Sequence, residues 1–324
     1  MLKTRVTEML GIEHPIIAGP MAYISDADFV AAVSNTGALG VLASLSFQSP
    51  EELGEQVTRT KSLTDKPFAV NVTLLPSARP VDYGAYMKAA IDAGATIIET
   101  SGRSPEPYME LLKGAGVVTM HRATRTRDIR TAERVGMDMA TIVGTEAAGH
   151  PGQEDVTTMV RVPIAADAVS IPIIAAGGIS DGRGMVAAMA LGAEAVLMGT
   201  RFMCSKECKV HANIKEWLKG LNEMDTIMTQ RSLMNATRVV RTEHTEKILE
   251  MENKGATLEE LMPFITGQRG VNAYATGETD GAQITVGQVV GMLDDEPSLQ
   301  EIVDGMVADA SKIMGRLQGI GLAG

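Results

Sequence analysis

Two glycine-rich turns contain the residues best suited to hold a phosphate group. Gly177 and Gly178 follow one short apolar run, and Gly199 and Thr200 follow the next. Glycine lets ligand oxygens approach the backbone closely, and backbone N–H groups at the start of a helix bind phosphate well. Two such turns on successive runs predict a phosphate site. Turns that need glycine only for their own backbone shape are the alternative.

A histidine in a glycine-containing loop is the candidate for proton transfer. His150 follows Gly149 and precedes Pro151 and Gly152, after another apolar run. A side chain in such a loop is not expected in the core, and imidazole exchanges protons near neutral pH. We therefore predict His150 to be catalytic, with an ordinary surface-loop histidine as the alternative.

Three further side chains lie where other apolar runs end. Asn71 offers a donor and an acceptor to a polar ring edge, and Arg122 supplies a fixed positive charge. Met21 should point to the same end of the fold as these two residues. A turn-capping role for Asn71 and a surface position for Arg122 are the alternatives.

A serine-hydrolase motif competes with this interpretation. Residues 178–182 match G-x-S-x-G, which would make Ser180 the nucleophile and His211 or His244 the base. The triad acid should lie between nucleophile and base, and neither Glu194 nor Glu207 has a suitable setting. The sequence therefore favours other chemistry over hydrolysis.

Two more motifs are weaker. Residues 182–187 match the dinucleotide fingerprint G-x-G-x-x-A, but no acidic residue follows the next run to hold a ribose. Cys204 and Cys208 lie near His211, yet a zinc site would need a fourth ligand. We expect no metal site.

The elements that must position these residues alternate regularly. Eight short apolar runs predict strands buried on both faces, and amphipathic segments between them predict helices. This order predicts an α/β fold, a TIM (β/α)8 barrel, with a doubly wound sheet as the alternative. The predicted strands are His14–Ala18, Ala38–Ala43, Phe68–Leu74, Thr96–Thr100, Gly116–Met120, Met139–Val143, Pro172–Ala176 and Ala195–Met198. The predicted helices are Asp26–Asn35, Pro50–Ser62, Tyr83–Ala93, Pro105–Lys113, Thr126–Val135, Thr157–Ala168 and Gly182–Leu191.

The 324 residues exceed the roughly 250 of a typical barrel. Residues 213–278 are polar with helical spacing and no convincing strand, so we expect a helical insertion that covers the barrel mouth as a lid. Residues 1–212 and 279–324 would form the barrel, whose last element returns at Gly287–Leu293 and Ser298–Leu317. A separate C-terminal helical domain is the alternative.

Composition limits the partners. A net charge of −11 argues against nucleic acid and anionic membrane surfaces. No apolar run reaches the roughly 18 residues of a membrane span, and the N-terminus has no signal-peptide pattern. Two cysteines indicate a reducing compartment, so we expect a cytoplasmic protein. The oligomeric state is open, with a homodimer among the options.

Five motifs in order resemble the nitronate monooxygenase (2-nitropropane dioxygenase) family, which includes FMN-dependent NADH:quinone reductases and enoyl-ACP reductases. The resemblance covers nearly the whole chain. The motifs are Ile17–Met21, Asn71–Pro76, Ala148–Gly152, Gly177–Ile179 and Gly199–Phe202.

The resemblance implies one FMN at the mouth of a TIM-like barrel. It implies that Gly177, Gly178, Gly199 and Thr200 hold the FMN phosphate and that His150 is catalytic. Further contacts to the flavin ring would come from Gly19, Met21, Asn71, Gly149 and Arg122, the last at a position often occupied by lysine in the reductases.

The substrate is a small molecule: a nitronate, a quinone or an enoyl thioester. We predict oxidation of alkyl nitronates with O2, and a reductase using NADH or NADPH as co-substrate is the alternative. The reductases carry a glutamine for NADH where this chain has Ser77, Ala78 and Arg79.

Overall fold

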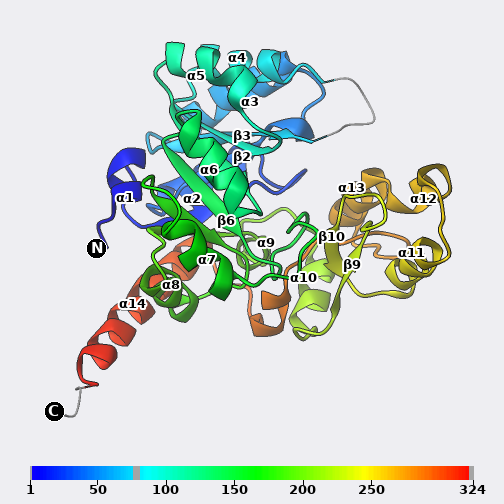
Figure 1. Cartoon of the computed structure of the whole chain (residues 1–324). Helices are drawn as coiled ribbons and strands as arrows, with labels where there is room; N and C mark the ends of the chain where they lie inside the picture. The colour runs from blue at the N-terminus through cyan, green and yellow to red at the C-terminus, as the bar shows by residue number, and fades with distance from the viewer. Residues whose placement is uncertain (1, 76–80, 321–324) are drawn as a thin grey trace.

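Eight parallel strands form the centre of the computed structural model, which describes residues 2–75 and 81–320 (Figure 1). Their hydrogen-bonded order is β1-β8-β7-β6-β5-β4-β3-β2, and a bridge between Ile17 and Leu39 joins β1 to β2. The sheet therefore closes into a nearly complete barrel. The strands are β1 (Ile16–Ala18), β2 (Gly40–Ala43), β3 (Phe68–Leu74), β4 (Ile97–Gly102), β5 (Val118–Ala123), β6 (Met139–Val143), β7 (Ile173–Ala176) and β8 (Ala195–Met198).

Helices cover the outside of this barrel. They are α2 (Ala27–Asn35), α3 (Pro50–Leu63), α4 (Tyr83–Asp92), α5 (Met109–Gly114), α6 (Thr126–Arg134), α7 (Thr158–Ala166) and α8 (Gly182–Ala190). The long helix α14 (Leu299–Gln318) packs against α8 and α2, where the eighth barrel helix belongs. The predicted TIM barrel is confirmed, and each predicted strand overlaps an observed one.

Capping side chains start these helices where the sequence expects them. Asp26, Ser49, Asp82, Asp181 and Ser298 each accept a hydrogen bond from a backbone N–H in the first turn. Such caps satisfy donors that have no intrahelical partner. Two short helices were not predicted, α1 (Arg5–Leu10) and α9 (Thr200–Met203), because four to six residues are too few for a periodic pattern.

Residues 213–278 are not entirely helical, so the prediction of an insertion without strands was wrong. An antiparallel pair, β9 (Thr226–Thr229) and β10 (Thr237–Val240), lies among α10 (Ala212–Lys219), α11 (Glu243–Asn253), α12 (Leu258–Ile265) and α13 (Gly267–Thr276). Each strand has four residues, mostly buried, and such short strands give little alternation to detect.

The insertion lies to one side of the barrel, opposite the protruding end of α14 (Figure 1). Its chain also runs beside residues that follow it, because Val240 N donates to Ile284 O over 2.8 Å. The division of the chain at residues 212 and 279 stays a prediction. The connection back to α14 contains a short 3-10 helix, η3 (Gln288–Met292), as expected for the returning segment.

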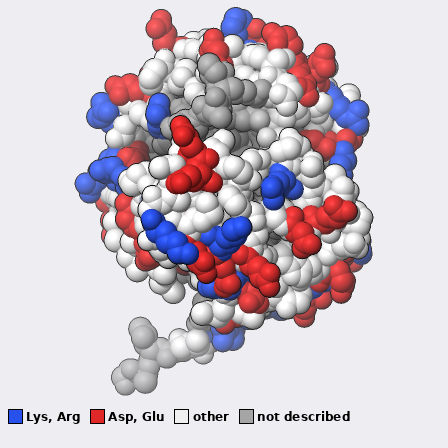
Figure 2. Space-filling model, turned by 90° about the vertical axis from the view of Figure 1, so that its right-hand side faces the viewer, with Lys and Arg blue, Asp and Glu red and all other residues white. Residues whose placement is uncertain are grey.

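Acidic and basic side chains are interspersed on the face that the insertion presents (Figure 2). Among the described residues, we find no helix with the length and apolar character needed to cross a bilayer.

The inside of the barrel is apolar at its base and becomes polar towards the carboxyl ends of its strands. Ile17, Leu39, Met120, Met139 and Ile174 pack together in the interior. On β4, by contrast, the inward positions change from Ile97 to Glu99 and Ser101. The polar residues named by the sequence analysis therefore meet at one end.

The buried His121 should make the fold acid-sensitive. Its Nδ1 lies 2.8 Å from Thr100 Oγ1, and burial, with a smaller effect of Arg122, lowers its pKa from 6.5 to about 4. The unfolded chain takes up the proton near pH 6.5 while the folded chain resists it. The contribution of His121 to the free energy of unfolding is therefore fully present above pH 6.5. It is lost as the pH falls towards 4, by roughly 2–3 kcal/mol at pH 4.5.

His121→Asn keeps an amide near Thr100 and should remove this part of the acid sensitivity. Urea unfolding of both proteins at pH 7 and pH 4.5 measures it, and the other titrating groups cancel in the comparison. Equal losses of unfolding free energy in the two proteins would contradict the assignment.

Candidate active site

One cavity of about 1140 Å³ opens at the carboxyl ends of the strands, between the barrel and the insertion. Ligand pockets in proteins are commonly about 300–1,000 Å³, so this one has room for a cofactor together with a substrate. All ten residues predicted for the site line it: Gly19, Met21, Asn71, Arg122, Gly149, His150, Gly177, Gly178, Gly199 and Thr200. Their placement agrees with one site, and their individual roles stay predictions.

The glycines of the two turns are needed for different reasons. Gly177 and Gly178 have φ of +93° and +73°, a left-handed backbone that favours glycine even without a ligand. A Cβ on Gly177 would also lie 3.1 Å from Ala147. Gly199 has φ of −117°, which any residue adopts, and a Cβ there would meet only Met21 at 3.8 Å. The missing side chain of Gly199 thus keeps ligand space open.

Thr200 connects this turn to the segment that returns from the insertion. Its Oγ1 accepts a hydrogen bond of 2.9 Å from Gly287 N. A Cβ on Gly287 would lie 2.7 Å from Glu146 O, so the returning segment crosses close to the β6–α7 loop (residues 144–157). The Thr200 hydroxyl hydrogen is left to donate to a ligand oxygen in the cavity.

The β6–α7 loop presents His150 to the cavity. His150 is an exposed residue: its imidazole opens into the cavity, although many protein atoms lie around it. Burial, with a smaller effect of Arg122, lowers the pKa of His150 to about 4. Water in the cavity moderates the effect of burial, but both causes act in the same direction. His150 is therefore neutral at pH 7, able to accept a proton at one nitrogen and to donate from the other.

Arg122 is the cation of the site. It is half-buried on β5, and in the described ranges 2–75 and 81–320 no carboxylate forms an ion pair with it. Its charge reaches three neighbours: it lowers the pKa of His121 and His150 and favours the ionised form of Glu99. A guanidinium without an ion pair in a cavity is suited to bind an anionic ligand.

Glu99 is a site residue that the sequence analysis missed. It is fully buried on β4, and its Oε2 accepts a 2.6 Å hydrogen bond from Asn71 Nδ2. Burial raises the pKa of Glu99, against smaller opposing effects of Arg122 and Asn71. Within the described part of the chain, its Oε1 has no hydrogen-bond partner. A glutamate inside the apolar run Thr96–Thr100 was the signal that could have revealed it.

A chain of hydrogen bonds fixes the orientation of Asn71. Ser101 Oγ donates to Thr73 Oγ1 over 3.1 Å, and Thr73 Oγ1 donates to Asn71 Oδ1 over 2.8 Å. With Glu99 on the Nδ2 side, the amide has one orientation, and its second N–H is available to the cavity. Asn71 is 3% exposed and belongs to this network rather than capping a turn.

The insertion and the segment after it form the opposite wall of the cavity. This wall was predicted only as a lid, without residues, because most of its polar side chains come from short strands and irregular chain. The polar residues are Gln230, Asn235, Thr237, Thr266, Tyr274, Gln283 and Thr285.

The hydrolase motif does not form a triad. Ser180 is buried, and its hydroxyl contacts Met292 Sδ at 3.4 Å. His211 Nδ1 accepts from Asn213 N at the start of α10, and His244 Nε2 lies 2.9 Å from Phe264 O. Both histidines are half-buried, and each contacts a hydrogen-bond partner of its own.

The remaining motifs have packing explanations. A Cβ on Gly182 would lie 2.6 Å from Asp309 Cβ, so this glycine lets α8 approach α14 closely. Cys204 and Cys208 are free and buried. The described part of the chain contains no group of three His, Cys, Asp or Glu side chains placed to hold a metal ion.

Comparison with known proteins identifies the class to which this site belongs. The model of the nitronate monooxygenase family matches residues 3–309. FabK from Thermotoga maritima superimposes with a TM-score of 0.92 at 35% identity, covering 98% of this chain and 99% of that one. A nitroalkane oxidase from Streptomyces ansochromogenes, at 22% identity and a TM-score of 0.83, supports the fold alone.

Curated relatives give two different activities. The chain is 31% identical to (3aS,4S,5R,7aS)-5-hydroxy-7a-methyl-1-oxo-octahydro-1H-indene-4-carboxyl-CoA dehydrogenase from Rhodococcus jostii, over 96% of each chain. It is 30% identical to a probable nitronate monooxygenase from Staphylococcus saprophyticus, over 97% of this chain and 99% of the relative. This chain belongs to the nitronate monooxygenase family and is an oxidoreductase.

The enzymes of this family are in general flavin enzymes, and the residues present fit a flavin. Gly199 leaves space beside Met21, Thr200 has a free hydroxyl hydrogen, and Arg122 provides a charge for an anionic group. Arg122, which forms no ion pair within the described residues, and the open side of Gly199 are features that a protein without a ligand here would not need.

Gly199→Val should therefore prevent flavin binding without unfolding the protein. The larger side chain fills the space next to Met21, and we expect the affinity for flavin to fall by about 100-fold or more. Gly177→Ala provides the contrast, because strain at φ +93° should lower the melting temperature instead. Flavin absorbance after titration and thermal unfolding of both apoproteins measure this. Wild-type flavin affinity in Gly199→Val would contradict the assignment.

Proposed function

We propose that this protein is an FMN-dependent nitronate monooxygenase that oxidises alkyl nitronates with O2, with His150 as its catalytic residue. The observation that carries the proposal is the pairing of a neutral imidazole, His150, with the unpaired cation Arg122 in one cavity. A nitroalkane loses a proton from carbon and becomes an anion. A base next to a positive charge suits that change.

The chain's own residues divide the work. The phosphate of FMN fits the turns at Gly177, Gly178, Gly199 and Thr200, and a single phosphate suits this site. Asn71 donates its remaining N–H to the polar edge of the flavin ring. When bound, FMN supplies the electron acceptor, while His150 accepts the proton and Arg122 stabilises the negative charge. FAD would need space for an adenylate arm, which none of these motifs provides.

A reductase is the second candidate. The relative from Rhodococcus jostii is named as a dehydrogenase of a CoA thioester. Its sequence identity to this chain, 31%, is close to the 30% of the nitronate monooxygenase relative. In a reductase of a quinone or an enoyl thioester, neutral His150 would donate a hydrogen bond to the substrate carbonyl. NADH or NADPH would then be the reductant. Ser77–Arg79, which lack the reductases' glutamine, lie outside the described residues.

We further propose that the protein works in the cytoplasm on small molecules, without nucleic acid or membrane partners. Its net charge of −11 and the interspersed surface charges support this (Figure 2). A homodimer is the oligomer we would test first.

Anaerobic mixing of the purified flavoprotein with single substrates decides between the candidates. A nitronate should bleach the flavin absorbance, and O2 should restore it with release of a carbonyl product. Bleaching by NADH or NADPH, followed by reoxidation with an enoyl thioester or quinone, would replace the first proposal by the second. The released chromophore should have the mass of FMN, and FAD would contradict the cofactor assignment.

His150→Ala should lower turnover of a neutral nitroalkane by about 10²–10⁴-fold while retaining FMN, since the phosphate turns and Asn71 are untouched. If His150 removes a proton, the variant should still oxidise a pre-formed nitronate while failing with the neutral nitroalkane. Steady-state rates with both substrate forms measure this. His211→Ala is the matched control, because that imidazole only caps α10. Equal rates for wild type and His150→Ala would exclude His150 from the reaction.

A further inference from the structure

Arg238, on β10 of the insertion, contacts the loop that carries His150. We propose that Arg238 is a positioning residue that holds this loop in its active conformation. Its neighbours Thr237 and Val239 line the cavity, whereas Arg238 does not. Arg238 therefore acts through the loop rather than on substrate. The proposal rests on the catalytic role of His150 proposed above.

The main chain of Arg238 pairs with the residue that precedes His150. Arg238 N donates to Gly149 O over 2.7 Å, and Gly149 N donates back to Arg238 O over 3.2 Å. This is an antiparallel bridge between the insertion and the β6–α7 loop. Gly149 has φ of +67°, a conformation that the bridge helps to hold. The backbone direction entering His150 is thus set by a strand of the insertion.

The side chain of Arg238 holds the start of the same loop. The residue is 7% exposed, and its Nε donates to Thr145 O over 2.9 Å. Its Nη1 donates to Thr226 Oγ1 on β9, also over 2.9 Å. A buried guanidinium is stable only when its N–H groups find such acceptors. One side chain therefore ties the β6–α7 loop to both strands of the insertion.

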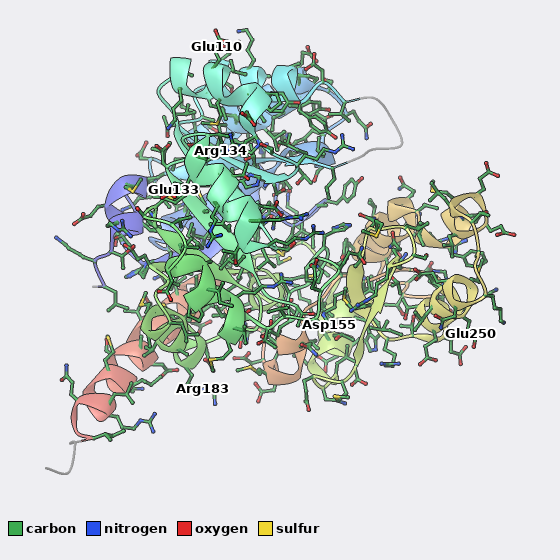
Figure 3. All side chains as sticks on the ribbon, viewed as in Figure 1. Glu110, Glu133, Arg134, Asp155, Arg183 and Glu250 are labelled. Carbon is green, nitrogen blue, oxygen red and sulfur yellow. The ribbon has the colours of Figure 1, made fainter. Side chains whose placement is uncertain are left out.

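Two other arginines hold the rest of the loop. Arg161 on α7 donates to Pro151 O over 3.2 Å and to Glu154 O over 3.1 Å. From the insertion, Arg231 donates to Gln153 O over 3.0 Å and pairs with Asp155. Figure 3 shows Asp155 beside β9, where barrel and insertion meet. The loop is thus held from both sides, and Arg238 is the insertion residue that contacts it next to His150.

The consequence is a specific kinetic effect. A shift of about 1 Å in a catalytic group can lower turnover by about 100-fold. Because Arg238 does not line the cavity, its loss should lower kcat and leave KM nearly unchanged. The loop's amides should also exchange faster, which a defect confined to substrate binding would not cause.

The test uses the flavin-loaded protein and the variant Arg238→Met, which keeps an unbranched side chain and the backbone N–H but removes the guanidinium donors to Thr145 O and Thr226 Oγ1. We expect amide hydrogen exchange at Gly149 to accelerate by about 10-fold or more and kcat to fall by about 10- to 100-fold. The NMR titration of His150 should move from its low pKa towards the ordinary value as the loop opens. Arg241→Met is the matched control, because Arg241 is exposed and pairs only with Glu246.

Unchanged exchange at Gly149 together with wild-type kcat in Arg238→Met would overturn the proposal, as would equal changes in Arg241→Met. Should Arg238→Met fail to fold, Thr226→Val removes only the hydroxyl acceptor on β9 and should accelerate Gly149 exchange to a smaller extent. No acceleration there would also overturn it. If wild type oxidises no nitronate, the proposed function fails, but the Gly149 exchange and the His150 titration still decide the role of Arg238.

Discussion

The strands of a closed parallel barrel are buried on both faces, and this constraint determines where the protein can do chemistry. Inside the barrel, side chains such as Leu39, Met120 and Met139 fill the centre and exclude water. Polar side chains are tolerated only towards the carboxyl ends of the strands, where the cavity begins. Asn71, Arg122 and His150 line the same cavity because Asn71 lies on β3, Arg122 lies near the end of β5, and His150 lies in the loop after β6. Glu99 lies deeper in the barrel than these residues. Within the described residues its Oε1 has no hydrogen-bond partner, which is uncommon for a buried polar atom.

The barrel supplies only part of the site, because its loops leave the mouth open on one side. The insertion and the segment after it close that side through direct hydrogen bonds to elements that line the cavity. Arg238 pairs with Gly149 next to His150, and Thr200 receives the N–H of Gly287. The part of the insertion that contains β9 and β10 is thus a fixed wall.

The sequence predicted the fold well because the barrel repeats a local pattern. Each buried strand is a short apolar run, and caps such as Asp26 and Ser298 mark helix starts, so strand order and closure follow from chain order. The ten residues predicted for the site line one cavity because strand ends converge in any barrel, and their roles stay predictions. Prediction from the sequence failed where the determinants are non-local. The pairing of β9 with β10 and the contact of Arg238 with the His150 loop depend on segments far apart in the chain, and four-residue strands carry almost no periodic signal.

The charge arrangement around His150 has opposite consequences for the two candidate reactions. Arg122 opposes an imidazolium, so His150 alone is a weak base. Proton removal from a nitroalkane, however, creates an anion as His150 becomes an imidazolium. An anion between this imidazolium and Arg122 stabilises both positive charges. The pKa of His150, which is low in the free enzyme, therefore rises once that anion forms. A reductase would need only a neutral imidazole N–H that points at the substrate carbonyl. The positive charge of Arg122 favours this neutral form of His150 throughout such a reaction. The geometry of the site suits either reaction. The two reactions differ in whether His150 takes up a proton from the substrate or only donates a hydrogen bond to it.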